Sequence, residues 1–322
     1  MSAVIEVEHL SKTYVVPFKR TKVPAVHDLS FTVNEGEIFG LIGPNGAGKT
    51  TTIRMLMGLI TPSAGRAKIF GHVIPARAAR AQLGFLPETP YFYDYLSVAE
   101  LIDLAGRLCG IDKQTRRKRT EELIELVGLG HAGSKQLKKF SKGMLQRAGI
   151  AQALVHDPKL IVFDEPMGGL DPVGRKEVRD IIFSLRERGK TVFFSSHILA
   201  DVEMICDRVA IVHKGKLREV EDMSELHTQK VMGTEVVLRV AAGTDDLPAF
   251  VGELGDVGEL GDGASVRRTR DEVHLSLPPK FDVDELLGKA LAADMSVVSV
   301  GARHETLEDH FMHLTQGKDK DA

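Results

Sequence analysis

The first part of the chain alternates short apolar runs with longer stretches in which apolar residues recur every three or four positions. The runs at 38–42 and 160–163 are almost wholly apolar, which is typical of strands buried on both faces of a parallel sheet, and a further core strand is expected at 191–196. This alternation continues from residue 29 to residue 213. It predicts an α/β fold in which a mostly parallel sheet is covered by helices.

Weaker patterns predict the remaining elements of this part. We expect a helical stretch over 97–130 and a helix from Ser141 to about Val155. A turn at Lys214-Gly215 separates two short final strands. Further strands are expected at 3–10, 29–33, near 67–70 and at 83–86, with a turn-rich basic stretch between the first two.

From about residue 230 the pattern changes, which predicts a larger domain over 1–225 and a small accessory domain over 230–322. In the accessory domain we expect strands near 236–241, 265–269, 272–278 and 295–300, and helices at 245–254, 282–292 and 305–316. That order is compatible with a small α+β sandwich of the βαββαβ type plus a terminal helix.

Composition and charge narrow the function. The 322 residues are 43% hydrophobic and 27% charged, and the net charge of -3 gives no reason to expect nucleic acid as a partner. No apolar run approaches the length that crosses a bilayer, and the N-terminus lacks a secretory pattern, so we expect a cytoplasmic protein. Cys109 and Cys206 lie in apolar helical patterns without metal-type spacing, which predicts buried, reduced thiols.

The strongest motif is a phosphate-binding loop between the predicted strand 38–42 and the helix that follows it. Its glycines permit backbone angles that let successive N–H groups face one anion at a helix N-terminus. Lys49 adds a positive charge against the outer phosphates, and the Thr50 hydroxyl is placed to ligate Mg²⁺. The loop and its helix start comprise Gly43, Pro44, Asn45, Gly46, Ala47, Gly48, Lys49, Thr50 and Thr51.

Two further groups fall at the same expected sheet edge. Asp164 and Glu165 follow the buried strand 160–163, where adjacent carboxylates are costly unless a cation or a reacting group uses them. His197 follows strand 191–196, and both a packed residue and a catalytic one fit that position. Tyr14 is either a partly buried edge aromatic or a flat face for an adenine ring.

Together these motifs resemble the ATP-binding subunit of an ABC transporter over roughly residues 3–220. The loop matches that family's Walker A motif and Leu160–Glu165 its Walker B strand. Tyr14 matches the adenine-stacking aromatic, Leu170-Asp171 the loop that crosses to the other subunit, and His197 the switch histidine. The resemblance implies a P-loop NTPase core with an antiparallel β portion and a helical signature subdomain.

Two motifs depart from the family pattern. The usual Leu-Ser-Gly-Gly-Gln signature reads Phe140-Ser141-Lys142-Gly143-Met144, which keeps Ser141 and Gly143 for a γ-phosphate contact. Glu88 stands where the family usually has a Mg²⁺-sensing glutamine; a carboxylate can still ligate Mg²⁺. Both forms, and the C-terminal domain, are similar to the subset of ATPases paired with ABC-2-type membrane proteins, mostly exporters.

The resemblance implies roles and partners. Asp164, with Thr50 and Glu88, would hold Mg²⁺, Glu165 would polarise the attacking water, and His197 would contact the γ-phosphate of ATP. Because the signature serine faces the partner's ATP, we expect a dimer of this chain or with a paralogue. A separate membrane permease would hold the dimer at the cytoplasmic face of the membrane. Two alternatives remain at this point: a soluble ABC-type ATPase, and a regulatory nucleotide-binding module.

Overall fold

The structure is a computed structural model. It describes residues 2–15, 21–229, 231–239, 265–269, 271–279 and 281–316. Within that part the chain divides into two compact units, one of residues 2–223 and 311–316 and one of residues 224–310. The division falls beside the expected boundary at 225–230, but it splits the terminal helix at residue 311 instead of leaving it with the accessory domain. No described helix is long and apolar enough to cross a membrane.

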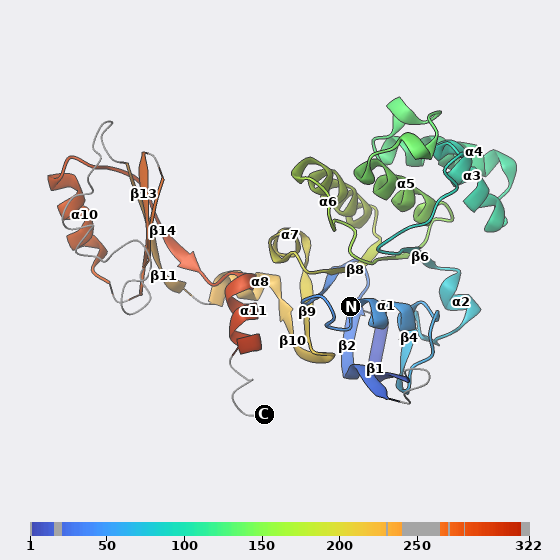
Figure 1. Ribbon diagram of the computed structural model, residues 1–322, viewed down its shortest axis with the longest axis horizontal. Helices are drawn as coiled ribbons and strands as arrows, with labels where there is room; N and C mark the ends of the chain where they lie inside the picture. The colour runs from blue at the N-terminus through green and yellow to red at the C-terminus, as the bar shows by residue number, and fades with distance from the viewer. Residues whose placement is uncertain are drawn as a thin grey trace. The chain divides into compact units, whose positions relative to one another are not determined.

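The first unit is built on a ten-stranded sheet with strand order β5-β4-β1-β2-β10-β9-β3-β8-β7-β6 (Figure 1). The elements of this unit are β1 (Ala3–Val15), β2 (Lys22–Asn34), β3 (Ile38–Ile42), α1 (Lys49–Leu56), β4 (Ala64–Ile69), β5 (His72–Val73), α2 (Arg77–Arg80), β6 (Leu83–Leu86), α3 (Val98–Leu108), α4 (Lys113–Leu126), two short 3₁₀ turns (Gly130–Ala132 and Leu137–Lys139), α5 (Lys142–Leu154), β7 (Leu160–Phe163), α6 (Pro172–Glu187), β8 (Thr191–Ser196), α7 (Leu199–Ile205), β9 (Arg208–His213) and β10 (Lys216–Asp222).

The middle of this sheet is parallel, as the apolar runs predict. β9, β3, β8, β7 and β6 pair in parallel, and every residue of β3, β7 and β8 is buried. Because parallel strands end at the same edge, the residues that follow β3, β7 and β8 lie close together. The sheet order therefore brings the phosphate-binding loop, Asp164 and His197 to one edge.

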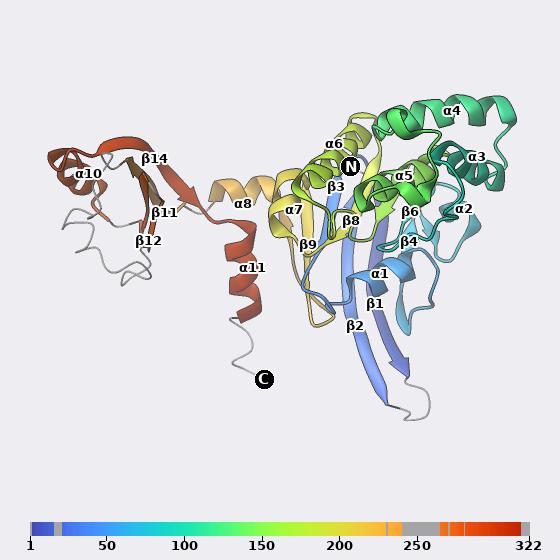
Figure 2. The ribbon, with the colours of Figure 1, turned by 45° about the horizontal axis from the view of Figure 1, so that its top comes forward.

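The remaining strands form the antiparallel portion, and its two long strands differ from the expected ones. β1 and β2 pair over 13 residues each, beyond the expected 3–10 and 29–33 (Figure 2). Their pairing contains register shifts, and His9 and Asp28 take left-handed φ values of 52°. Such bulges interrupt the alternation of side chains, so a period-of-two pattern misses the outer halves of the hairpin.

α3, α4 and α5 form a helical group beside the β6 edge (Figure 1). The expected stretch 97–130 is broken between α3 and α4, where Gly110 has a φ of +75° and Asp112 caps α4. The expectation of two buried thiols is wrong for Cys109, which is exposed, and right for Cys206. Cys109 is the C-cap residue of α3, so it lies beyond the last helical residue and outside the buried face of the helix.

The second unit contains a four-stranded antiparallel sheet with strand order β12-β13-β11-β14. In chain order this is 2-3-1-4, the strand arrangement of the expected βαββαβ sandwich. α10 packs on the sheet through Leu286 and Ala290. The expected helix at 245–254 lies outside the described residues. Its elements, with the connecting and terminal helices, are α8 (Met223–Gln229), β11 (Val231–Arg239), β12 (Ser265–Arg268), β13 (Glu272–Leu277), α10 (Val283–Ala292), β14 (Ser296–His304) and α11 (Leu307–Gln316).

Candidate active site

The phosphate-binding loop connects β3 to α1, and its glycines are required by the surrounding backbone. A Cβ at Gly43 would overlap the carbonyl oxygen of Val212 in β9. Gly48 is the N-cap of α1 with a φ of +102°, and a Cβ there would lie 2.6 Å from the carbonyl oxygen of Ala25. Side chains at these positions would push the loop away from neighbouring strands, so glycine fixes its shape.

Lys49 connects the loop to the end of β7. The residue is 5% exposed, and its Nζ donates hydrogen bonds to the carbonyl oxygens of Gly43 at 2.6 Å and Pro44 at 3.3 Å. The same Nζ lies 3.1 Å from Oε1 of Glu165. The loop cation and the carboxylate expected to activate water therefore form one buried ion pair.

The Asp164 carboxylate is buried among hydroxyl groups. Its Oδ1 accepts hydrogen bonds from Ser195 Oγ at 2.7 Å and from Thr50 Oγ1 at 3.2 Å. Burial raises the pKa of Asp164, the two hydroxyl groups lower it, and the charges of Glu88 and Glu165 raise it further. A buried carboxylate beside a threonine hydroxyl is a donor set that suits Mg²⁺, which prefers hard oxygen ligands.

Both the backbone and the side chain of Glu165 are held by neighbouring residues. Its backbone N–H donates to Ser195 Oγ at 2.9 Å, and its Oε2 lies 2.8 Å from Nδ1 of His197. Glu165 has a φ of 50°, a backbone conformation that residues other than glycine adopt at an energetic cost. Ser195 thus binds the Asp164 carboxylate and the backbone of Glu165, a role that sequence reasoning missed. Its only signal was a hydroxyl residue at the end of a buried strand.

Most of the expected site residues line one of two neighbouring cavities. One, of about 440 Å³, is lined by Ala25, Glu88, Glu165 and the loop residues Pro44, Asn45, Gly46, Ala47, Gly48, Lys49, Thr50 and Thr51. The other, of about 430 Å³, is lined by several of the same groups together with Lys142, Gly168, Gly169 and His197. Asn45, Glu88 and Glu165 line both, so the two cavities form one continuous catalytic region.

Six expected site residues do not line either cavity of this single chain: Tyr14, Gly43, Ser141, Gly143, Asp164 and Asp171. Ser141 caps α5 by accepting a hydrogen bond from Met144 N, and a Cβ at Gly143 would meet no atom within 4 Å. Asp171 caps α6 by accepting from Gly174 N at 2.8 Å. The ring of Tyr14 is 38% exposed, with Lys12 Nζ 5.3 Å from its centroid.

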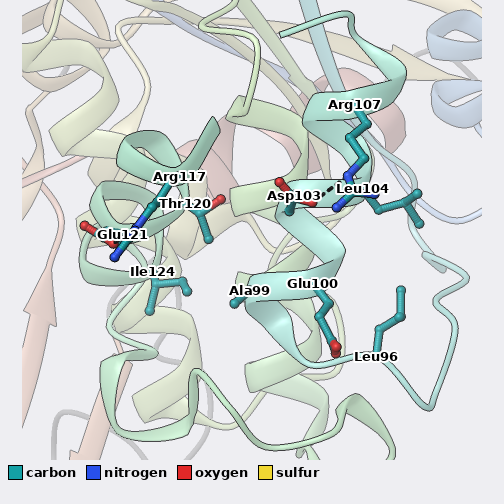
Figure 3. A pocket seen from close by; sticks show the side chains of 10 residues that line it. All are labelled: Leu96, Ala99, Glu100, Asp103, Leu104, Arg107, Arg117, Thr120, Glu121 and Ile124. Atoms are coloured by element: carbon teal, nitrogen blue, oxygen red, sulfur yellow. Dashed lines mark hydrogen bonds and ion pairs between the residues drawn. The ribbon is translucent and has the colours of Figure 1, made fainter. Parts of the chain in front are cut away.

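A third cavity, of about 580 Å³, lies between α3 and α4, away from the phosphate-binding loop (Figure 3). Asp103 on its wall pairs with Arg107 at 2.7 Å, and Figure 3 shows this pair beside Leu104. Asp103 also accepts from Arg116 Nε at 2.8 Å, which ties α3 to α4. Because no phosphate-binding loop lines this third cavity, the cavity is not a nucleotide site of the P-loop type.

A glycine loop at a helix N-terminus, its lysine, and a carboxylate pair at the end of a neighbouring parallel strand define a P-loop nucleotide-binding protein. A family model described as ABC transporter matches residues 26–168. An uncharacterized ABC transporter ATP-binding protein of Synechocystis sp., sll0415, is 42% identical over 312 residues, covering 96% of this chain and 84% of that protein. This chain therefore belongs to the family of ABC transporter ATP-binding proteins.

Two further comparisons concern the whole chain and the fold. The linearmycin resistance ATP-binding protein LnrL of Bacillus subtilis is 31% identical over 314 residues, covering 97% of this chain and 98% of LnrL. The dimeric post-hydrolysis structure of the ATP-binding cassette MJ0796, bound to ADP and Pi, has a TM-score of 0.62 at 23% identity. It covers 68% of this chain and 98% of that one, which shows the shared fold.

Proposed function

We propose that this chain binds and hydrolyses ATP and uses that cycle to drive export through a separate membrane subunit. The observation that carries the proposal is the placement of Glu165 between Lys49 Nζ, at 3.1 Å, and His197 Nδ1, at 2.8 Å. This puts a phosphate-binding cation on one carboxylate oxygen of the candidate base and a candidate γ-phosphate contact on the other. Hydrolysis needs these groups on the nucleophile side of the phosphate.

The ion pair suggests how ATP binding prepares the base. The phosphates would attract Lys49 from Glu165, because a phosphate anion in the glycine loop offers that ammonium a more highly charged partner. Glu165 Oε1, which contacts the Lys49 ammonium in the described structure, would then be available to polarise a water molecule. His197 keeps the other oxygen in place, so the carboxylate orientation survives the exchange.

Asp164 and Thr50 are the residues we assign to Mg²⁺, with Glu88 at the rim of the same region. The ion would neutralise charge on the leaving phosphates. The protein's part is to hold the carboxylate ready: Ser195 donates to Asp164 and positions it without adding charge. Tyr14 is our candidate for adenine stacking, since its ring is partly exposed on β1.

A dimer is the proposed active form. Ser141, Gly143 and Asp171 lie outside the cavities that the phosphate-binding loop lines, although the family motif assigns them to a nucleotide. These residues would instead contribute to the nucleotide site of a second chain, because a two-fold dimer places the signature of each chain against the phosphate-binding loop of the other. The dimeric MJ0796 cassette shares the fold and supports this arrangement.

Export is the proposed direction of transport. LnrL is named for linearmycin resistance and matches this chain over both units, including the C-terminal one. Removal of a toxic compound from the cell is the simplest role for a resistance ATPase. We therefore propose docking to a membrane permease, which would hold this chain at the cytoplasmic face of the membrane.

The test of this function is phosphate release by the purified chain over a series of protein concentrations, with the mass of Glu165→Gln in ATP measured in parallel. Turnover that rises more steeply than linearly with protein, and an ATP-dependent dimer of the variant, would support a homodimer. A chain that neither binds nor hydrolyses ATP, alone or with its permease, would refute the proposal.

A further inference from the structure

Of the four residues by which this chain departs from the usual family motifs, the two charged ones line the same cavity. Lys142 replaces a glycine of the usual signature, and Glu88 replaces a glutamine. Both line the 430 Å³ cavity that also contains Glu165 and His197. They come from distant parts of the chain, one after β6 and one at the start of α5.

A glycine leaves room for the Lys142 ammonium in this cavity. A Cβ built at Gly169 would overlap the Nζ of Lys142 and would lie 3.6 Å from its Cε. The lysine ammonium therefore rests directly on bare backbone in the segment between Glu165 and Asp171. Gly169 also has a φ of +67°, which favours glycine independently of the contact. Any side chain at that position would displace the ammonium.

Neither charge is neutralised by a direct contact. Both side chains are exposed, and within the described part of the chain neither Lys142 nor Glu88 forms an ion pair or hydrogen bond. Glu165 is already engaged by Lys49 and His197. Glu88 therefore adds a negative charge close to where phosphates would bind, and Lys142 is the cation with no partner that faces the same space.

We propose that Lys142 and Glu88 act as a compensating charge pair across the catalytic cavity. The ammonium offsets the repulsion between Glu88 and the nucleotide phosphates, so the two departures leave the net charge of the cavity as it would be with glutamine and glycine. The inference rests on the proposed nucleotide-binding function. Lys142 is a positioning and electrostatic residue, distinct from the groups that act on the reacting atoms.

The experiment is a double-mutant cycle of ATP affinity, with Lys142→Gln, Glu88→Gln and the double variant measured by equilibrium binding without Mg²⁺ and with it. In Mg²⁺-free buffer at low ionic strength we expect Lys142→Gln to weaken ATP binding about three- to tenfold and Glu88→Gln to strengthen it by a similar factor. Because the two effects have opposite signs, the double variant should return to within about twofold of the wild-type affinity. Both single effects should shrink as salt rises, because exposed charges are screened.

A matched control is Lys113→Gln. Lys113 occupies the first position of α4 as Lys142 does of α5; it is exposed and lines neither cavity of the catalytic region. Its variant should bind ATP like the wild type, and thermal unfolding of all variants should confirm that they fold. Wild-type chain that fails to bind ATP would refute the proposed function. Wild-type binding together with a Glu88→Gln variant that does not bind ATP more tightly, a double variant that stays as weak as Lys142→Gln, or single effects that salt does not alter, would refute only the charge pair.

Discussion

Removal of the positive charge of Lys49 should destabilise the nucleotide-free protein through Glu165. The two side chains are 6% and 8% exposed, and Nζ lies 3.1 Å from Oε1. At an effective dielectric constant of about 20, two unit charges at this distance attract by about 5 kcal/mol before desolvation is counted. Desolvation offsets most of that gain, but deleting one partner leaves the other charge buried at a cost of about 3–5 kcal/mol.

For Lys49→Met we expect the lower end of that range. His197 remains 2.8 Å from the other oxygen of Glu165 and is itself 41% exposed, so the carboxylate keeps one polar partner. A loss of about 3 kcal/mol lowers the melting temperature of a unit of this size by about 6–12 °C. The double variant Lys49→Met/Glu165→Gln should recover most of this loss, because the unpaired charge is gone.

The assay is calorimetric unfolding without nucleotide or Mg²⁺, in which the transition that ATP raises in the wild type identifies the first unit. Lys113→Met serves as the control for loss of a lysine charge at the first position of a helix. A Lys49→Met protein that melts like the wild type, or a double variant whose loss equals the sum of the single losses, would refute the buried ion pair as described.

Four further substitutions test other parts of the account. Gly43→Ala should abolish ATP binding, as binding assays would show, because its Cβ would overlap a carbonyl oxygen of β9. The Cβ of Gly46→Ala would meet nothing within 4 Å, so this variant should lose only about 1 kcal/mol of stability in melting curves, for its φ of +82°. Gly169→Ala should weaken ATP binding at low salt much as Lys142→Gln does; unchanged affinity would contradict the contact. Asp103→Asn should lower stability at neutral pH by about 1 kcal/mol. Arg116 and other partners lower the Asp103 pKa, so its stabilisation is present above the ordinary value of 3.8, and acid unfolding should show it disappear as pH falls through the folded value.

The parts of the site that the sequence predicts are those in which chemistry and local structure coincide. The loop from Gly43 to Thr50, Asp164-Glu165 and His197 each follow an apolar strand directly, so the parallel-sheet rule alone brings them to one edge. Ser195 could not be found this way, because a serine in a buried strand has many uses and only the fold shows which groups it reaches.

Long-range contacts and irregular backbone account for the other differences. That Glu88 and Lys142 line the same cavity depends on how α5 packs beside β6, which no local pattern encodes. The outer halves of β1 and β2 were missed because bulges break the alternation of side chains. The 2-3-1-4 strand order of the second unit was compatible with the sequence, since short strands and helices in that order have few ways to pack.

The most direct test of the central claim is a comparison of ATP binding and phosphate release by the wild type and Glu165→Gln. The account predicts that the variant binds ATP with nearly wild-type affinity while phosphate release falls by about a hundredfold to ten thousandfold, as expected for loss of a general base. A variant that hydrolyses ATP as fast as the wild type would remove Glu165 from the mechanism and contradict the assignment of this site.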